Sequence, residues 1–178
     1  MISLSPKQVI FKSSNMQIKK YEELEKWQQR LLQEAESVMK NAYNLYSHFY
    51  VGAAILTKKE NIYKGTFAEN SSQGMTICAE PAAILTANTN GERKYKAIAI
   101  IGGGETFDSE SPITPCGRCR QIIYDFSQIS DYNIQIICSN TKKDKIILTN
   151  IKELLPLPFG PKDVGIDLTR FKKEYNNP

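Results

Sequence analysis

The sequence contains little histidine and little cysteine, and this scarcity limits the metal sites that it can build. Its 178 residues include one histidine, His48, and four cysteines, Cys78, Cys116, Cys119 and Cys138. A histidine-rich zinc site is therefore excluded, and a catalytic metal would need mostly sulfur ligands. In a protein of the reducing cytosol, cysteines at this spacing indicate metal or redox chemistry before disulfides.

Long apolar runs and basic patches are missing as well. No segment approaches the roughly 20 apolar residues of a membrane-spanning helix, and residues 1–7 lack the apolar core of a signal peptide. The net charge of +4 comes from scattered lysines. We therefore expect a cytoplasmic, single-domain globular protein without a membrane or nucleic-acid partner.

Apolar periodicity predicts alternating helices and strands. An amphipathic helix is expected over 21–43, with Trp27 packed in the core. Gly102 to Thr114 is expected to be a loop, and it lacks the glycine pattern of a phosphate site. The remaining expected elements are strands at 51–56, 62–67, 96–101, 134–138 and 145–148, and helices at about 78–87, 117–126 and 151–155. This order indicates an α/β layer fold.

Two short segments carry the candidate chemistry: Cys78-Ala79-Glu80 and Pro115-Cys116-Gly117-Arg118-Cys119. A zinc ion that activates water needs three protein ligands, an open position and a separate acid–base group. Cys78, Cys116 and Cys119 with Glu80 supply that set, which is the pattern described for zinc deaminases of nucleobases. Both segments are expected where a loop enters a helix, where partial positive charge favours thiolates.

Glu80 lies two positions after Cys78, close enough to reach a zinc-bound water without binding the metal. It would take a proton from that water, pass it to a ring nitrogen and protonate the departing ammonia. Two alternatives remain open on spacing alone: a structural zinc with Cys138 as the fourth ligand, and a redox pair of Cys116 and Cys119. Cys138 ends an apolar run, which favours a buried free cysteine, and a redox pair leaves Cys78 and Glu80 unexplained.

With these residues identified, the chain from about 24 to 163 resembles the cytidine deaminase family in its small homotetrameric form. The matching motifs are Tyr46-Ser47-His48-Phe49 with Val51-Gly52-Ala53-Ala54, Glu69-Asn70, Cys78-Ala79-Glu80, Pro115-Cys116-Gly117 with Cys119-Arg120-Gln121, and Leu154-Leu155-Pro156 with Phe159-Gly160-Pro161. The resemblance implies a three-layer α/β/α fold, with a mixed five-stranded sheet and helices on both faces. We expect a flexible arm at 1–20, the catalytic domain at 21–165 and a polar tail at 166–178.

The resemblance also implies roles for individual residues. One zinc per subunit would be bound by Cys78, Cys116 and Cys119, and Glu80 would move protons. Four further residues would bind the substrate: Phe49 packs on the pyrimidine, Glu69 accepts a hydrogen bond from the ribose, the backbone at Ala79 holds the base, and Phe159 reaches a neighbouring subunit's pocket.

Two positions depart from the family pattern. Phe67 stands where the family usually has an asparagine that grips a ribose hydroxyl; it either packs or marks a different sugar. Pro81 stands where the family has an arginine that offsets the thiolate charge, and Arg118 is either a replacement for it or an ordinary surface residue. Blasticidin S deaminase, within the same family, also lacks the first arginine and has one at the second position.

The resemblance implies hydrolysis of cytidine and 2′-deoxycytidine to the uracil nucleosides and ammonia, in pyrimidine salvage. An alternative is a deaminase of a modified cytosine nucleoside, like blasticidin S. A nucleic-acid editing deaminase would need a basic strand-binding channel. A catalytically silent, zinc-stabilised interaction protein is the third possibility, which Phe67 and Pro81 support.

Overall fold

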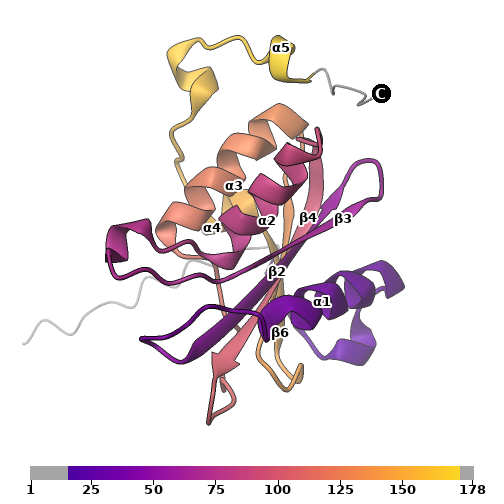
Figure 1. Cartoon of the computed structure of the whole chain (residues 1–178). Helices are drawn as coiled ribbons and strands as arrows, with labels where there is room; N and C mark the ends of the chain where they lie inside the picture. Colours follow the sequence, from indigo (N-terminus) through magenta and orange to yellow (C-terminus); the bar gives the residue numbers. More distant parts are fainter. Residues whose placement is uncertain (1–15, 173–178) are drawn as a thin grey trace, which may run out of the picture.

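A six-stranded mixed sheet forms the centre of the computed structural model, which describes residues 16–172 (Figure 1). The strand order is β1-β6-β5-β4-β2-β3. β4 and β5 run parallel, and the other neighbouring strands are antiparallel. The strands are β1 (Gln17–Lys19), β2 (Phe49–Thr57), β3 (Ile62–Thr66), β4 (Tyr95–Gly104), β5 (Gln135–Ser139) and β6 (Ile146–Asn150).

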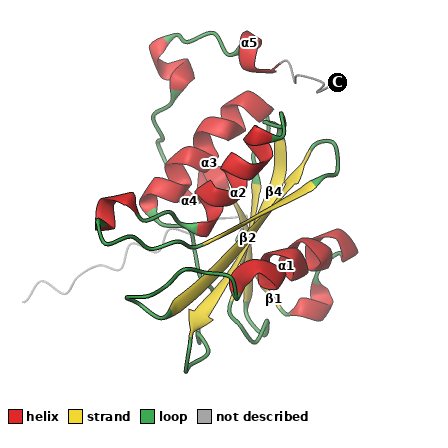
Figure 2. Ribbon diagram, viewed as in Figure 1, coloured by secondary structure: helices red, strands yellow, loops and turns green. Residues whose placement is uncertain are grey.

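Helices cover both faces of this sheet, as Figure 2 shows. They are α1 (Lys26–Met39), α2 (Ala79–Thr89), α3 (Gly117–Ser130), α4 (Ile151–Leu154) and α5 (Thr169–Lys172). Successive strand residues point to opposite faces, so Ala54 of β2 joins the core cluster under α1, and Ala53 joins the cluster under α2 and α3. The expected α/β/α layers are confirmed.

Two glycines bring α1 and α2 close to the sheet on opposite sides. A Cβ atom on Gly52 of β2 would lie 2.1 Å from the Ala35 carbonyl oxygen of α1. A Cβ atom on Gly65 of β3 would lie 2.1 Å from the Ala83 nitrogen of α2. Both helices therefore sit at a distance that only glycine permits, and this fixes the position of α2.

The expectation of five strands was wrong, because β1 adds a sixth. Gln17, Ile18 and Lys19 pair antiparallel with Leu148, Ile147 and Ile146 of β6. These residues were expected in a flexible arm spanning 1–20, of which residues 1–15 lie outside the described part of the chain. The strand is short, and Ile18 is 75% exposed, so the sequence carries no apolar pattern that would reveal it.

Two local expectations also need correction. Trp27 lies in the first turn of α1 with 36% of its surface exposed, and its indole N–H donates to the Glu25 carboxylate at 2.7 Å. The buried face of α1 is formed instead by Gln28, Leu31, Leu32 and Ala35. The loop expected from Gly102 to Thr114 begins later than predicted. The strand β4 continues through the three glycines to Gly104, which pairs with Phe49 of β2.

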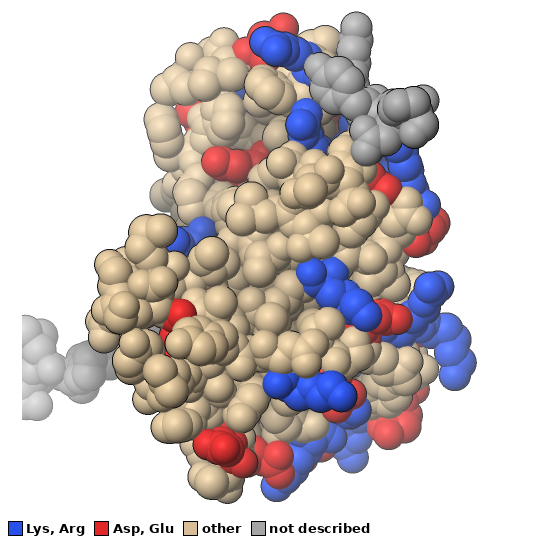
Figure 3. Space-filling model, in the orientation of Figure 1, with Lys and Arg blue, Asp and Glu red and all other residues tan. Residues whose placement is uncertain are grey.

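Surface charge is mixed on the face seen in Figure 3, where acidic and basic side chains lie among one another. Lysines on the turn between β5 and β6 are partnered by acidic groups: Lys143 with Glu36 at 2.6 Å and Lys142 with Asp108 at 3.8 Å. Within residues 16–172, none of the helices combines the length and apolar character needed to span a membrane.

Candidate metal centre and active site

Three cysteine sulfurs meet where α2 and α3 begin. Cys78 immediately precedes α2, Cys116 immediately precedes α3, and Cys119 lies in the first turn of α3. The sulfurs of Cys78 and Cys116 are 4.0 Å apart, those of Cys116 and Cys119 are 3.4 Å apart, and all three lie within 4.8 Å of one another. Thiolates about 2.3 Å from a tetrahedral zinc are roughly 3.8 Å apart, so the cluster fits that metal.

The fourth cysteine is not part of this group. Cys138 lies in β5, is fully buried, and belongs to the apolar core under α2 and α3. The expectation of a buried free cysteine is confirmed. A four-cysteine structural site is therefore not formed, and three sulfurs leave one tetrahedral position open, as a catalytic zinc site requires.

Backbone hydrogen bonds from outside the helix hold Ile77, the residue that precedes Cys78. Ala68 and Ile77 exchange two backbone hydrogen bonds of 2.9 Å in an antiparallel bridge. Continued by one residue, this register places Phe67 opposite Cys78. Pro81 occupies the third position of α2, where its missing N–H breaks no helical hydrogen bond.

The sulfurs of Cys78 and Cys119 have different proton affinities. Hydrogen bonding from the Cys119 side chain is the main cause that lowers the pKa of Cys78 to about 6; burial opposes this shift, and hydrogen bonding to Cys116 and the Arg118 charge contribute to it. The same contact with Cys78, together with burial, raises the pKa of Cys119. Negative charge is therefore best accommodated at Cys78, at the N-terminus of α2.

Glu80 is a buried acid next to this cluster. It lies in the first turn of α2, and only 4% of its surface is exposed. Burial raises the pKa of its carboxyl to about 7, and the negative charge at Cys78 adds to the increase. A carboxyl group with a pKa near neutrality can both accept and donate a proton, as a proton shuttle requires.

A groove between α2 and α3 opens beside the sulfurs. It has a volume of about 290 Å³, and its lining includes Cys78, Pro81, Arg118, Cys119 and Gln121. The structure thus brings Arg118 to the same groove as Pro81. The Arg118 charge is close enough to lower the pKa of Cys78.

Glu69 organises the loop in front of β2. Its Oε2 accepts hydrogen bonds from the backbone N–H groups of Tyr46 at 2.7 Å and Ser47 at 3.2 Å. Burial opposes ionisation of Glu69, but hydrogen bonds from Ser47 and Tyr46 outweigh it and lower the pKa of the carboxyl. Glu69 also lines a pocket of about 300 Å³ with Tyr46 and Thr76.

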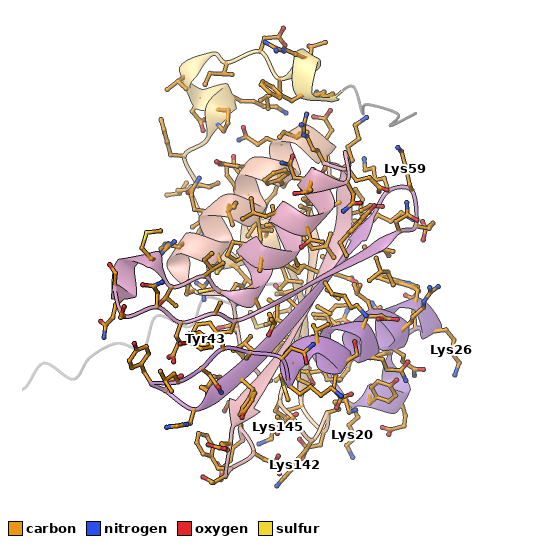
Figure 4. The ribbon with its side chains drawn as sticks, in the orientation of Figure 1. Lys20, Lys26, Tyr43, Lys59, Lys142 and Lys145 are labelled. Carbon is orange, nitrogen blue, oxygen red and sulfur yellow. The ribbon has the colours of Figure 1, made fainter. Side chains whose placement is uncertain are left out.

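The segment 67–69 is anchored to the chain that follows α1. The Tyr43 N–H donates to the Phe67 carbonyl at 3.0 Å, and the Glu69 N–H donates to the Tyr43 carbonyl at 2.7 Å. Figure 4 shows Tyr43 in this loop. Phe67 and Glu69 are consequently held together through the backbone of Tyr43.

The other expected substrate-binding residues lie at different depths. Ala79 is fully buried at the start of α2, and Phe49 is partly buried at the start of β2. Phe159 is 65% exposed, and its carbonyl accepts a hydrogen bond from Gln121 Nε2 of α3 at 2.9 Å. Gln121 lines the groove, whereas Phe159 is not among the lining residues.

One supporting residue was not assigned a role from the sequence. Arg120 donates from Nε to the Pro115 carbonyl at 2.8 Å and from Nη1 to the Leu154 carbonyl at 3.1 Å. It fixes the turn that leads into Cys116. Its place in the Cys119-Arg120-Gln121 motif indicated a family feature, but spacing alone does not reveal its two backbone partners.

Comparison with known proteins identifies the family. The cytidine and deoxycytidylate deaminase zinc-binding region matches residues 25–135. This chain belongs to that family. Its zinc-binding region contains the sulfur cluster, so zinc is the cofactor of the three-cysteine site.

Individual relatives are similar over most of the chain. Cytidine deaminase of Sporosarcina psychrophila is 38% identical over 137 residues, which span 77% of this chain and 94% of the relative. Blasticidin-S deaminase of Bacillus cereus is 33% identical over 113 residues, spanning 62% of this chain and 76% of the relative. The crystal structure of cytidine deaminase from Burkholderia pseudomallei superposes with a TM-score of 0.66 at 32% identity, covering 73% of this chain and 97% of that one.

Proposed function

We propose that this protein is a zinc-dependent hydrolase that converts cytidine and 2′-deoxycytidine to uridine and 2′-deoxyuridine with release of ammonia. The observation that carries the proposal is the meeting of three cysteine sulfurs, within 4.8 Å of one another, beside the buried acid Glu80. The cytidine deaminases of Sporosarcina psychrophila and Burkholderia pseudomallei match this chain over 94% and 97% of their own length.

Each chemical step has a group to serve it. Cys78, Cys116 and Cys119 would hold a zinc ion, which when bound would supply a water of lowered pKa. Glu80 accepts the proton of the water that adds to C4 of cytosine and delivers it to N3. Glu80 then takes the proton of the hydroxyl added at C4 and delivers it to the exocyclic nitrogen, so that the C4–N bond breaks, neutral ammonia leaves and the C4 carbonyl forms.

Charge balance at the metal is assigned to Arg118. Three thiolates on one divalent ion leave a net negative centre, which weakens its action as a Lewis acid. Arg118 already lowers the pKa of Cys78 in the groove. We assign to it the role that an arginine at position 81 has in the family.

The nucleoside would be bound by Phe49 on the base, by the Ala79 backbone at the reacting edge and by Glu69 on the ribose. We also propose a homotetramer, in which Phe159 of one subunit completes the site of the next. The 65% exposure of the Phe159 side chain supports this role, because an aromatic ring so far from its own core gains from an intersubunit contact. We place the enzyme in the cytoplasm, in pyrimidine salvage.

A second candidate function is deamination of a modified cytosine nucleoside. Phe67, which the bridge register places opposite Cys78, cannot donate or accept a hydrogen bond through its side chain. A blasticidin-S deaminase is among the relatives. Both observations favour a substrate whose sugar differs from ribose at the hydroxyl that faces position 67.

A direct absorbance assay separates these functions. Zinc-loaded protein would be given cytidine, 2′-deoxycytidine, free cytosine and blasticidin S in parallel. Rapid loss of the cytidine signal is the expected result. Turnover of blasticidin S without turnover of cytidine would select the second candidate. Zinc-containing protein that converts none of the four would contradict the proposed function and favour a silent, zinc-stabilised protein.

A further inference from the structure

An exposed phenylalanine lies next to the aromatic residue expected to hold the base. Phe107 belongs to the loop that leads from β4 to Cys116, and 60% of its surface is exposed. Its ring centroid is 6.3 Å from that of Phe49, with the two planes inclined by 43°. This separation is within the range of favourable aromatic pairs, although Phe107 leaves most of its ring uncovered.

Strand parity places both rings on the face of the sheet that carries the metal centre. Ala53 of β2 and Ile100 of β4 belong to the core under α2 and α3. Residues two apart share a face, so Phe49 and Gly104 point to that side as well. A Cβ atom on Gly104 would lie 2.1 Å from the Phe107 ring, which shows that the ring rests on the end of β4.

The loop that carries Phe107 is fixed at both of its sides. The Gly104 N–H donates to the Phe107 carbonyl at 3.1 Å, and the Ser109 hydroxyl donates to the Gly102 carbonyl at 2.8 Å. The Glu105 N–H donates to the carbonyl of His48 at 2.9 Å. Since His48 immediately precedes Phe49, the loop and the base-binding residue are positioned together.

We propose that Phe107 is a specificity-determining residue of the deaminase site, which extends the apolar wall of Phe49 and contacts the nucleoside. This inference rests on the proposed function. The flat ring of a cytosine nucleoside matches an apolar wall of two aromatic rings, and its binding removes the exposed Phe107 ring from water. A phenylalanine that is held in place before the substrate arrives loses little rotamer freedom on binding.

Steady-state kinetics tests this role. Phe107→Ala is expected to raise KM for cytidine about three- to tenfold, the loss of one aromatic contact, with kcat within twofold and zinc content unchanged. Phe171→Ala is the matched control, because it removes an equally large ring that is 42% exposed in α5. An unchanged KM in the Phe107 variant, or an equal rise in the control, would overturn the assignment.

A fluorescence reporter separates direct contact from mere support of Phe49. Trp27 is the only tryptophan of the chain, so Phe107→Trp combined with Trp27→Phe leaves one indole at the loop. Titration with the product uridine should change its emission, and the change should be half-maximal at the concentration that inhibits cytidine turnover by half at low cytidine concentration. An emission that does not respond would overturn direct contact. Failure of the wild-type protein to convert any cytosine nucleoside would instead reject the proposed function, and this assignment with it.

Discussion

The metal centre and the nucleoside wall are built in different ways. The metal centre takes its ligands from two helix starts, and Glu80 lies two residues from Cys78 on the same helix. The proposed wall combines Phe49 at the start of β2, Phe67 and Glu69 from one segment after β3, and Phe107 from the loop after β4, and hydrogen bonds hold these segments together. Substitution at the first region should therefore abolish chemistry, whereas substitution at the second should alter which substrate is bound.

The largest effect is expected at a sulfur. Cys116→Ala removes one of three zinc ligands, and we expect the protein to lose its zinc and at least about 10³-fold in kcat/KM. Metal analysis of the purified protein with a cytidine assay measures both. Cys138→Ala is the control, since Cys138 is buried outside the sulfur group. Zinc loss in the control, or full zinc content in the Cys116 variant, would contradict the three-cysteine site.

The next effect is expected at Gly65, where β3 packs closely against the backbone of α2. In Gly65→Ala, the added methyl group would lie 2.1 Å from the Ala83 nitrogen and 2.6 Å from the Ala79 carbonyl oxygen. We expect the free energy of unfolding to fall by about 1–3 kcal/mol, because the backbone of α2 must move. Urea denaturation measures this loss. Gly74→Ala is the control, because no atom lies within 4 Å of its Cβ position.

A smaller effect is expected at the sugar side of the wall. Phe67→Asn would supply a hydrogen-bond partner opposite Cys78 and should lower KM for cytidine about three- to tenfold, the value of one hydrogen bond. The kcat value should change little. An unchanged KM would show that Phe67 serves packing, and a lower KM only for a modified nucleoside would assign the site to that substrate.

The smallest effect is expected at the opposite end of α3. The Asp131 carboxylate accepts hydrogen bonds from Lys172 and Lys162, which lower its pKa. An aspartate whose pKa is lowered by folding stabilises the protein above the unfolded-state pKa of about 3.9, and this contribution disappears as the pH falls through the folded-state pKa. Because the pair is exposed, Asp131→Asn should cost only a few tenths of a kcal/mol at pH 7.

The Asp131→Asn protein and the wild-type protein would be compared at different pH values and at different salt concentrations. Thermal unfolding midpoints of the two proteins should converge as the pH falls below 3.9, and should also converge in high salt, which screens exposed charges. A difference that persists in acid would show that Asp131 acts through packing or helix capping instead of charge.

The contrast between the regions also explains what the sequence could predict. Cys78 and Glu80 are close in sequence, as are Cys116 and Cys119. Helix geometry alone therefore places the first pair at the start of α2 and the second pair at the start of α3. The alternation of helices and strands followed from apolar periodicity, whereas the α/β/α order of layers was implied by the family resemblance. Cys138 could be set aside because its apolar run indicated a buried strand.

Long-range pairings could not be predicted from periodicity. β1 pairs with a strand about 130 residues later, through three residues of which only Ile18 is apolar. Trp27 fits the apolar stripe of α1 by spacing, but the helix begins at Lys26, and the indole bonds to Glu25 instead of entering the core. Phe107 meets Phe49 only because β4 extends through three glycines and ends beside β2.

The most direct test of the central claim is the rate of cytidine hydrolysis by Glu80→Gln protein that carries one zinc per chain. Glutamine keeps the shape of the side chain but cannot accept and return a proton, so the rate should fall at least about 10³-fold while zinc content and folding are unchanged. Retained activity in the zinc-loaded variant would contradict Glu80 as the proton shuttle and the mechanism built on it.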